Sequence, residues 1–534
     1  MPSTRCLALA ALATLHACGP GSPAPADETG TSTSDETATT QGEPTTSTSS
    51  PTSTTSTTST TSTTDEPTTD GTTSPDEPPP PVACMVAPGD HTQAVCPGGE
   101  CPIDIDIEIR CGDNLAGPGL RVAAAGSAMW VAAATETDAV LYRIGVEGGD
   151  ANAVAGSDRS PRAGVAQRTP VPARFARTTL HLAIAGTGNL HVAAEVPIND
   201  QGDNGVAYLA EADSFVEQTV HDQGSAGSPI SGFQVVADAP HIFFFGDGPD
   251  DYHEATPDGQ GGWPLADVAL PPDGYGFGRF GRDAQGRLLA ADIREWKGLF
   301  RLSVEVDGSE VLLGKGLNSL SSFQHFVLAP SASPTPPVGP PFAAMLESAG
   351  GLEVAWPLGG TQSDSIKLPG VTLLEPTCSD TEYPDEGRAC PGPCHEQGQG
   401  FEHATGSFTR SSDGLGWAVV VTTQRDYDYE YELSCDEGDA IGCSCPGKLT
   451  NDASTSTLHL FRVTLDDTPP VEVLTLLVPR LELANAWAGF GDSLIGTHVD
   501  AFGQSLAIGM RLRGIQPGEV VVRALLVSTP GLTP

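Results

Sequence analysis

From about residue 120 onward, short apolar segments alternate with turns that contain glycine and aspartate. One motif recurs: an apolar strand, a Gly/Asp turn, and a second strand rich in alanine, valine and isoleucine. Short apolar runs bounded by turn residues predict β-strands. The copies lie at 120–135, 180–195, 233–246, 280–293, 408–423 and 486–500, with a weaker one at 342–356.

Further strand-like segments lie between these copies, so that one repeat holds about four short strands. A four-stranded unit repeated at roughly 50 residues is typical of a β-propeller blade. The doublet of strand, Gly/Asp turn and strand resembles the irregular blades of the seven-bladed propeller superfamily. We therefore predict an all-β, β-propeller-like domain of six or seven irregular blades over residues 120–534. Tandem β-sandwiches are the alternative.

The first residues have the pattern of a secretory signal. The run CLALAALATL at 6–15 follows Arg5. Its length is that of the apolar core of a signal peptide, and about half that of a membrane-spanning helix. We therefore predict a signal peptide over 1–17 and an exported chain. No later segment is apolar for long enough to cross a bilayer.

Leu15, His16, Ala17, Cys18 and Gly19 follow the apolar core. Leu15, Ala17 and Cys18 match the lipobox, and the segment resembles bacterial lipoproteins, although His16 replaces their usual small or apolar residue. The resemblance implies cleavage before Cys18, lipid on its thiol, and membrane anchoring. Gly19 in place of Asp implies the outer membrane or cell surface. The alternative is an ordinary secretory signal, although no good A-x-A site follows the apolar core.

Residues 19–82 are composed almost entirely of Ser, Thr, Pro, Asp and Glu. With so few apolar side chains, this segment cannot offset the entropy cost of ordering itself. Prolines and like charges extend it, and about 60 residues span roughly 40–50 Å as a coil. We predict that residues 18–82 form a disordered linker that holds the domain away from the membrane.

Ten cysteines remain besides Cys6 and Cys18, in two even groups. Even groups in an exported chain predict disulfides, with the pairing left open. The first group lies in a cysteine-rich segment at 83–119, and the second in two insertions at about 375–396 and 425–450. The candidates are Cys84, Cys96, Cys101, Cys111, Cys378, Cys390, Cys394, Cys435, Cys443 and Cys445.

Zinc is the alternative for part of the second group. Cys390 and Cys394, with Cys443 and Cys445, have a spacing that permits thiolate ligation, and His395 is adjacent. The oxidising compartment expected for an exported chain favours disulfides instead.

The segment IDIDIEIR at 103–110 alternates strictly between isoleucine and charged residues. In a strand, the four isoleucines share one face and the acidic residues share the other. We predict a half-buried strand whose acidic face is either solvated or binds cations.

The segment DQGDNGVAYLAE at 200–211 comes close to a calcium loop of the EF-hand type. Asp200 takes position one, Asn204 position five, Gly205 the sharp turn and Glu211 the bidentate position. Gly202 at position three supplies no side-chain oxygen, and the flanks are strand-like. The alternative is a hairpin turn around Asn204 and Gly205. Calcium is the one cofactor that the sequence suggests.

Two acidic segments carry tyrosines, at 246–259 and 425–439. As loops on a rigid scaffold they are candidates to bind a cationic protein or a carbohydrate. The alternative is that they are simply solvated.

The chain has 68 acidic and 26 basic residues, for a net charge of −42. Such a charge repels phosphate backbones and disfavours nucleic acid as a partner. There is no G-x-S-x-G, no H-E-x-x-H and no Walker phosphate loop. His395-Glu396 and Glu402-His403 offer metal-type ligands, but their spacing matches no helix-borne site. The sequence therefore predicts no catalytic residue.

These patterns together predict a lipid-anchored cell-surface protein that displays a binding module on an acidic stalk and is non-catalytic. The alternative is an extracellular propeller hydrolase or lactonase with calcium in the central channel. That alternative requires carboxylates and histidines from several blades to converge.

Overall fold

The structure is a computed structural model of the 534-residue chain. The predicted signal peptide, Cys18 and the linker lie outside the described residues. The described residues are 84–99, 101–110, 121–134, 139–145, 165–175, 178–198, 204–222, 230–246, 251–271, 274, 278–297, 299–317, 326–330, 339–348, 350–374, 377–378, 381–382, 390–435, 443–479, 495–500, 503–513 and 520–529.

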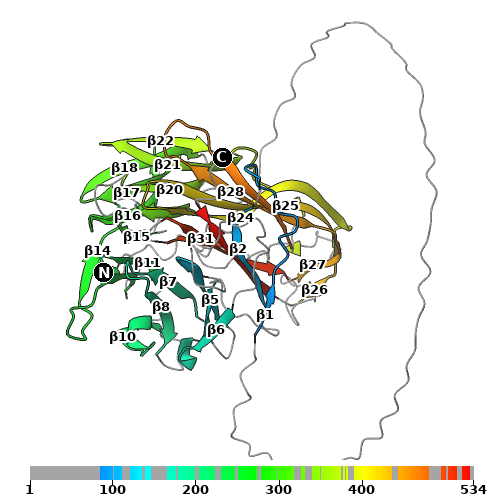
Figure 1. Ribbon diagram of the computed structural model, residues 1–534. Coiled ribbons are helices and arrows are strands. Elements are labelled where there is room, and N and C mark those ends of the chain that lie inside the picture. Colours follow the sequence, from blue (N-terminus) through cyan, green and yellow to red (C-terminus); the bar gives the residue numbers. More distant parts are fainter. Residues whose placement is uncertain are drawn as a thin grey trace, which may run out of the picture. The chain divides into compact units, whose positions relative to one another are not determined.

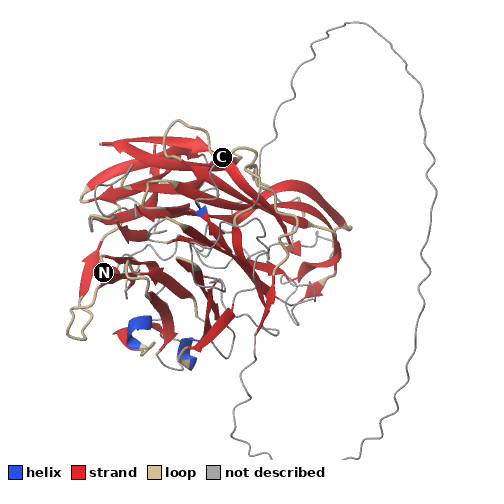
Figure 2. Cartoon of the chain, in the orientation of Figure 1, coloured by secondary structure: helices blue, strands red, loops and turns tan. Residues whose placement is uncertain are grey.

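Strands make up nearly all the regular structure of these residues (Figure 2). They form seven antiparallel sheets. Two 3-10 turns, η2 (Ala173–Phe175) and η3 (Glu211–Asp213), are the described helical elements. No helix among the described residues has the length and apolar character needed to cross a membrane.

Each of the first five sheets is a meander of four strands in chain order. The first holds β3 (Arg121–Ala125), β4 (Ala128–Ala134), β5 (Ala139–Gly145) and β6 (Val165–Pro170), and the second holds β7 (Leu180–Ile184), β8 (Leu190–Pro197), β9 (Asn204–Ala210) and β10 (Gln218–His221). The third holds β11 (Ile230–Val236), β12 (Ala239–Phe245), β13 (Tyr252–Ala255) and β14 (Leu265–Val268). The fourth holds β15 (Arg279–Arg282), β16 (Leu288–Trp296), β17 (Leu299–Val306) and β18 (Ser309–Leu317), and the fifth holds β19 (Phe326–Pro330), β20 (Phe342–Ser348), β21 (Gly351–Gly359) and β22 (Gln362–Lys367).

The sixth sheet is built on two long strands. These are β24 (Cys394–Arg410) and β25 (Gly416–Tyr431), followed by β28 (Thr455–Val463) and β29 (Val471–Val478). The far half of β25 also pairs with β27 (Cys443–Asp452), which in turn pairs with β23 (Thr381–Glu382) and β26 (Ser434–Cys435). This part of the sheet is the sequence region in which we predicted the two cysteine-rich insertions.

The seventh sheet joins the two ends of the described chain. It holds β30 (Ile495–Val499), β31 (Ser505–Arg513) and β32 (Val520–Ser528), and then β2 (Ile103–Arg110) and β1 (Met85–Pro88). Figure 1 shows the blue strands β1 and β2 beside the red C-terminal strands. We predicted that 83–119 lies ahead of the domain, whereas β2 belongs to the last sheet. The pairing joins residues more than 400 positions apart, so local pattern does not indicate it.

Each pair of successive sheets shares an apolar core, and the pairs close a cycle. One cluster lies between the sixth and seventh sheets, and the next lies between the seventh and the first. Five further clusters join the first to the second and so on to the sixth. The first strands also neighbour one another in this order, from β3 round to β30 and back to β3. This arrangement is β-propeller-like, because a sandwich core would join one pair of sheets only.

The recurring sequence motif is the hairpin of first and second strands in five sheets, which are the first four and the sixth. The other two copies are shifted by one strand relative to the hairpin of first and second strands. In the copy at 486–500, the last segment is β30, which opens a hairpin rather than closing one. The weaker copy at 342–356 is the second hairpin of its sheet, since β19 precedes it.

The alternating segment 103–110 forms β2, as predicted. Ile105, Ile107 and Ile109 are almost fully buried against the first sheet. Burying one such side chain contributes about 1.5–3 kcal/mol. The acidic face is not simply solvated, because Asp106 is buried and ion-paired with Arg523 of β32. The isoleucines therefore hold one face of β2 against the first sheet, and Asp106 fixes the register of β2 with β32.

Candidate functional site

Polar side chains join neighbouring first strands. The backbone N–H of Ala124 on β3 donates to Nδ1 of His498 on β30, at 3.1 Å. Oγ of Ser407 on β24 lies 2.9 Å from Oγ1 of Thr497 on β30. Burial lowers the pKa of His498 to about 4, so its ring is neutral at pH 7. These groups hold the first strands together.

Three basic side chains on other first strands form the candidate site. They are Arg121 on β3, His181 on β7 and Arg279 on β15, and each is partly exposed. Burial, and then the positive charges of Arg121 and Arg279, hold the pKa of His181 well below its usual value. The two guanidinium groups therefore lie close enough to act on one imidazole. We call these three residues the Arg–His cluster.

The imidazole of His181 is available for a ligand. Among the described residues, no hydrogen-bond or ion-pair partner is found for it. With a lowered pKa it is neutral at pH 7, so that one ring nitrogen donates and the other accepts. The two guanidinium groups keep their charge at any physiological pH. Nη1 of Arg279 donates to the carbonyl oxygen of Gly278 at 3.1 Å, and both arginines have further interaction partners.

Carboxylates are scarce on the first strands. Among their described residues, only Glu396 and Glu402 are acidic, and both lie on the long strand β24. Arg425 donates to Glu402 (3.0 Å) and forms an ion pair with Glu396 (3.4 Å). Glu396 also accepts the backbone N–H of Cys378 at 2.7 Å. Both carboxylates therefore belong to a buried ion-pair network with Arg425, in which Oε2 of Glu402 has no hydrogen-bond partner.

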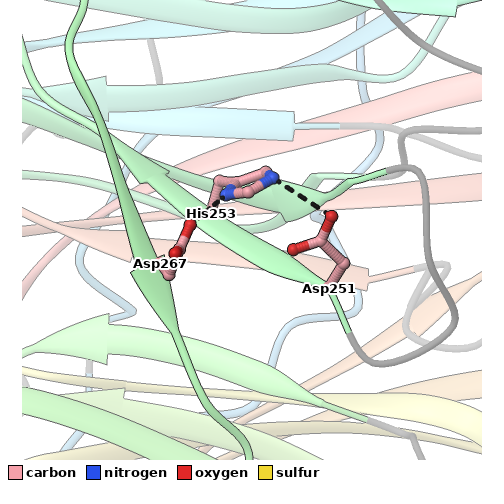
Figure 3. A group of neighbouring side chains, drawn as sticks. All are labelled: Asp251, His253 and Asp267. Atoms are coloured by element: carbon pink, nitrogen blue, oxygen red, sulfur yellow. Dashed lines mark hydrogen bonds and ion pairs between the residues drawn. The ribbon is translucent and has the colours of Figure 1, made fainter.

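A second group of side chains has metal-ligand chemistry (Figure 3). Nε2 of His253 on β13 lies 3.5 Å from Oδ2 of Asp251, and its Nδ1 lies 3.1 Å from Oδ1 of Asp267 on β14. One ligand atom from each residue lies within 4.8 Å of the others. A β-carbon at Gly246 would lie 2.6 Å from both Oδ2 of Asp251 and Nε2 of His253, so that a larger residue there would displace one of these side chains.

The geometry of this Asp–His–Asp group has two interpretations, a metal site and a surface ion pair. Both ring nitrogens of His253 already face a carboxylate, an arrangement that also suits a simple surface ion pair. Asp267 is 93% exposed. The segment 246–259 was a candidate from its sequence, but Asp267 lies outside it and joins the group only through the register of β13 and β14.

Two of the predicted calcium ligands, Asn204 and Glu211, lie at the two ends of one strand. Asn204 begins β9 and Glu211 follows its end, so about seven strand steps, or roughly 23 Å, separate them. Asp200 lies outside the described residues. The carboxylate of Glu211 accepts the backbone N–H of Leu190 at 3.0 Å, which gives it a structural role. The strand-like flanks that the sequence showed on both sides prevail over the loop pattern.

The disulfide prediction is confirmed for the described cysteines. Three bonds join Cys96 to Cys101, Cys378 to Cys394 and Cys390 to Cys445, and Cys84 and Cys443 are also disulfide-bonded. Each of the three bonds stays within its predicted group. The zinc alternative is wrong, because the four thiols that it needs are oxidised. Cys111 and the side chain of Cys435 lie outside the description.

The second tyrosine-bearing acidic segment is strand rather than loop at its start. Tyr427, Tyr429 and Tyr431 lie along β25, with ring centroids 5.2 and 6.2 Å apart. Asp428 lies between Tyr427 and Tyr429 on β25 and pairs with His395 of β24 at 2.8 Å. The segment is therefore a rigid extension of the sixth sheet, held by two of the disulfides.

One buried ion pair was not indicated by the sequence. Glu254 on β13 accepts from the guanidinium of Arg282 on β15 (2.6 and 2.5 Å) and lies 2.7 Å from Nδ1 of His241 on β12. Burial alone would raise the pKa of Glu254, but the bonds from His241 and Arg282 outweigh it and lower the pKa to about 2. The group links the third sheet to the fourth.

No family model and no curated protein matches the chain. Several solved structures are similar to it. The Kuenenia stuttgartiensis hydrazine synthase is 10% identical with a TM-score of 0.37, over 77% of this chain and 96% of that chain. The polysaccharide lyase Uly1 is 9% identical with a TM-score of 0.34, over 82% and 94%. The dihydro-heme d1 dehydrogenase NirN is 12% identical with a TM-score of 0.29, over 71% and 73%. Likeness at this level carries no argument about function.

Proposed function

We propose that the protein is an exported lipoprotein that displays a seven-bladed β-propeller on a disordered acidic stalk and acts as a non-catalytic binding module. The apolar run at 6–15, the lipobox-like segment ending at Cys18 and the composition of 18–82 support the anchor and the stalk. The disulfides support an oxidising compartment. Lipid on Cys18 places the protein at the outer membrane or cell surface.

The observation that carries the binding role is the extension of the sixth sheet. Tyr427, Tyr429 and Tyr431 lie along β25 there, with Asp428 between them, and two disulfides hold the segment. Aromatic and charged side chains held on a rigid scaffold are a usual form of a binding surface. A cationic protein or a carbohydrate fits this chemistry.

The alternative, a calcium-dependent hydrolase or lactonase, has less support. It needs carboxylates converging from several blades, and within the described first strands the two acidic residues are bound to Arg425. The Asp–His–Asp group offers metal ligands, but from the third and fourth strands of one sheet.

The anchor is tested by labelling cells with radioactive palmitate. Wild type should incorporate label, and Cys18→Ala should lose it. Cys6→Ala is the matched control, since it removes the other N-terminal cysteine from inside the signal peptide. Protease treatment of intact cells should then release the domain from wild type. Label that persists in Cys18→Ala, or its absence from wild type, would contradict the anchor.

A further inference from the structure

The Asp–His–Asp group is assembled by the register of the third sheet. His253 is on β13 and Asp251 comes two positions earlier, so their side chains share one face of the chain. His253 is also the direct cross-strand partner of Phe244 on β12 and of Asp267 on β14. The pairing of the strands therefore brings one imidazole and two carboxylates together, and Figure 3 shows a carboxylate on either side of the ring.

The imidazole of His253 is held in place by its surroundings. The centroid of its ring lies 5.8 Å from that of Phe244, which is fully buried. The backbone of Gly246 also approaches Nε2 of His253 closely, since a β-carbon there would lie 2.6 Å from it. The His253 side chain is only 16% exposed as a result. A ring that is already fixed loses little conformational freedom when it binds a ligand.

The two carboxylates of the group lack an arginine or lysine partner. Within the described part of the chain, His253 is the only ionisable side chain that contacts Asp251 or Asp267. The neighbouring Glu254, in contrast, contacts the guanidinium of Arg282 as well as a histidine. A protonated imidazole supplies one positive charge for two carboxylates, so at least one negative charge stays uncompensated. The group therefore attracts a cation.

The ligand set identifies the class of cation. Calcium and magnesium take oxygen ligands, whereas an imidazole nitrogen with carboxylate oxygens suits zinc and the related divalent transition metals. Ligands about 2.0–2.2 Å from one ion lie at most about 4.4 Å apart. One ligand atom from each residue already lies within 4.8 Å of the others. An ion uses one ring nitrogen, so the carboxylate at the other nitrogen has to turn toward it, and Asp267 is 93% exposed and has room to turn.

We propose that Asp251, His253 and Asp267 bind one divalent transition-metal ion, with zinc as the best fit. β14 is the outermost strand of its sheet, and its first three residues are exposed. An ion held by the group ties this edge strand to β13 and leaves a coordination position for water or an added ligand. The site is separate from the lipid anchor and from the binding surface on the sixth sheet, so the failure of either leaves this proposal standing.

Calorimetry on the full chain in mild detergent tests the site. Zinc chloride is the probe, and magnesium chloride is the comparison because magnesium prefers oxygen ligands alone. Wild type should bind one zinc ion with a micromolar dissociation constant, and zinc should raise its melting temperature. Magnesium should have neither effect at the same concentrations. A titration without saturable heat up to millimolar zinc, or one that magnesium reproduces, overturns the proposal.

Variants then locate the ion. Losing even an outer partner weakens a metal site about 10- to 100-fold, so Asp267→Asn and His253→Gln should each weaken zinc binding at least that much. Glu472→Gln is the matched control, because Glu472 pairs with a histidine in the same way, at 2.6 Å from Nδ1 of His459. It removes the same charge from a pair without a second carboxylate, and it should leave zinc binding unchanged.

Gly246→Ala keeps the proposal testable if a ligand variant does not fold. It retains all three ligand side chains, but its methyl group takes the space beside Asp251 and His253. Because it displaces one of them, it should weaken zinc binding about tenfold. Circular dichroism melting curves establish which variants are folded. If folded Asp267→Asn and folded Gly246→Ala bind zinc as tightly as wild type does, the ion lies elsewhere and the assignment is overturned.

Discussion

Replacing Asp106 with Asn tests how the N-terminal strand holds the ring of sheets closed. Oδ1 and Oδ2 of Asp106 on β2 accept from Nε and Nη2 of Arg523 on β32, at 3.0 and 2.7 Å. The side chains are 0% and 1% exposed. The substitution keeps the size of the side chain and removes its charge, so it leaves a guanidinium group buried without its counter-charge.

The expected cost follows from that burial. Removing one partner of a buried ion pair costs about 3–5 kcal/mol, because the remaining charge keeps its desolvation penalty. We therefore expect Asp106→Asn to lower the free energy of unfolding in urea by about 3–5 kcal/mol. Replacing both partners, as Asp106→Leu with Arg523→Met, should recover most of this loss, since no charge is then left buried.

Glu108→Gln is the matched control on the same strand. Glu108 pairs with Arg110 at 2.7 Å, but the two side chains are 12% and 31% exposed. A pair of this kind is worth about 0–1 kcal/mol. The reasoning is refuted if Asp106→Asn costs less than about 1 kcal/mol, or no more than Glu108→Gln.

Three further predictions concern other parts of the structure. The pKa of Glu254 falls from 4.5 to about 2 on folding, so its carboxylate stabilises the fold above about pH 4.5 and loses that effect as the pH falls toward 2. Glu254→Gln should therefore cost about 3 kcal/mol of unfolding free energy at pH 7. Melting curves should show that the difference in stability between the variant and wild type disappears near pH 2. The Cys378–Cys394 bond closes a loop with a sequence separation of 16. The double variant Cys378→Ser with Cys394→Ser should therefore lose about 3 kcal/mol of unfolding free energy, and limited proteolysis should cut the extension of the sixth sheet. Resistance to the protease equal to that of wild type would contradict this. Glu211 bonds to the backbone rather than facing Asn204, so Glu211→Gln should leave the heat of calcium addition unchanged in calorimetry; a calcium signal that is lost in this variant would restore the loop hypothesis.

Sequence patterns predicted the local units of the fold well. Hairpins such as β3–β4 and β7–β8 follow directly from two apolar runs around a turn, because their pairing is between neighbours in the chain. The burial of the isoleucines in 103–110 likewise follows from alternation alone. The copy at 486–500 was displaced by one strand because a first strand and a second strand look alike in composition.

Long-range partners were not accessible in the same way. Nothing near Asp106 in the sequence indicates Arg523, and nothing near Glu254 indicates Arg282 on the next sheet. The Arg–His cluster has the same origin, since its members lie on three strands of different sheets. The calcium-loop prediction has a related limit, because residues that are close in a loop lie far apart along a strand such as β9.

The central proposal is that the chain is an exported lipoprotein anchored through Cys18. Mass spectrometry of the N-terminal peptide, taken from protein purified out of membranes, measures this directly. We expect a mature N-terminus at Cys18 that carries lipid on the thiol. A mature N-terminus at any other residue, or an unmodified thiol on Cys18, would contradict the proposal.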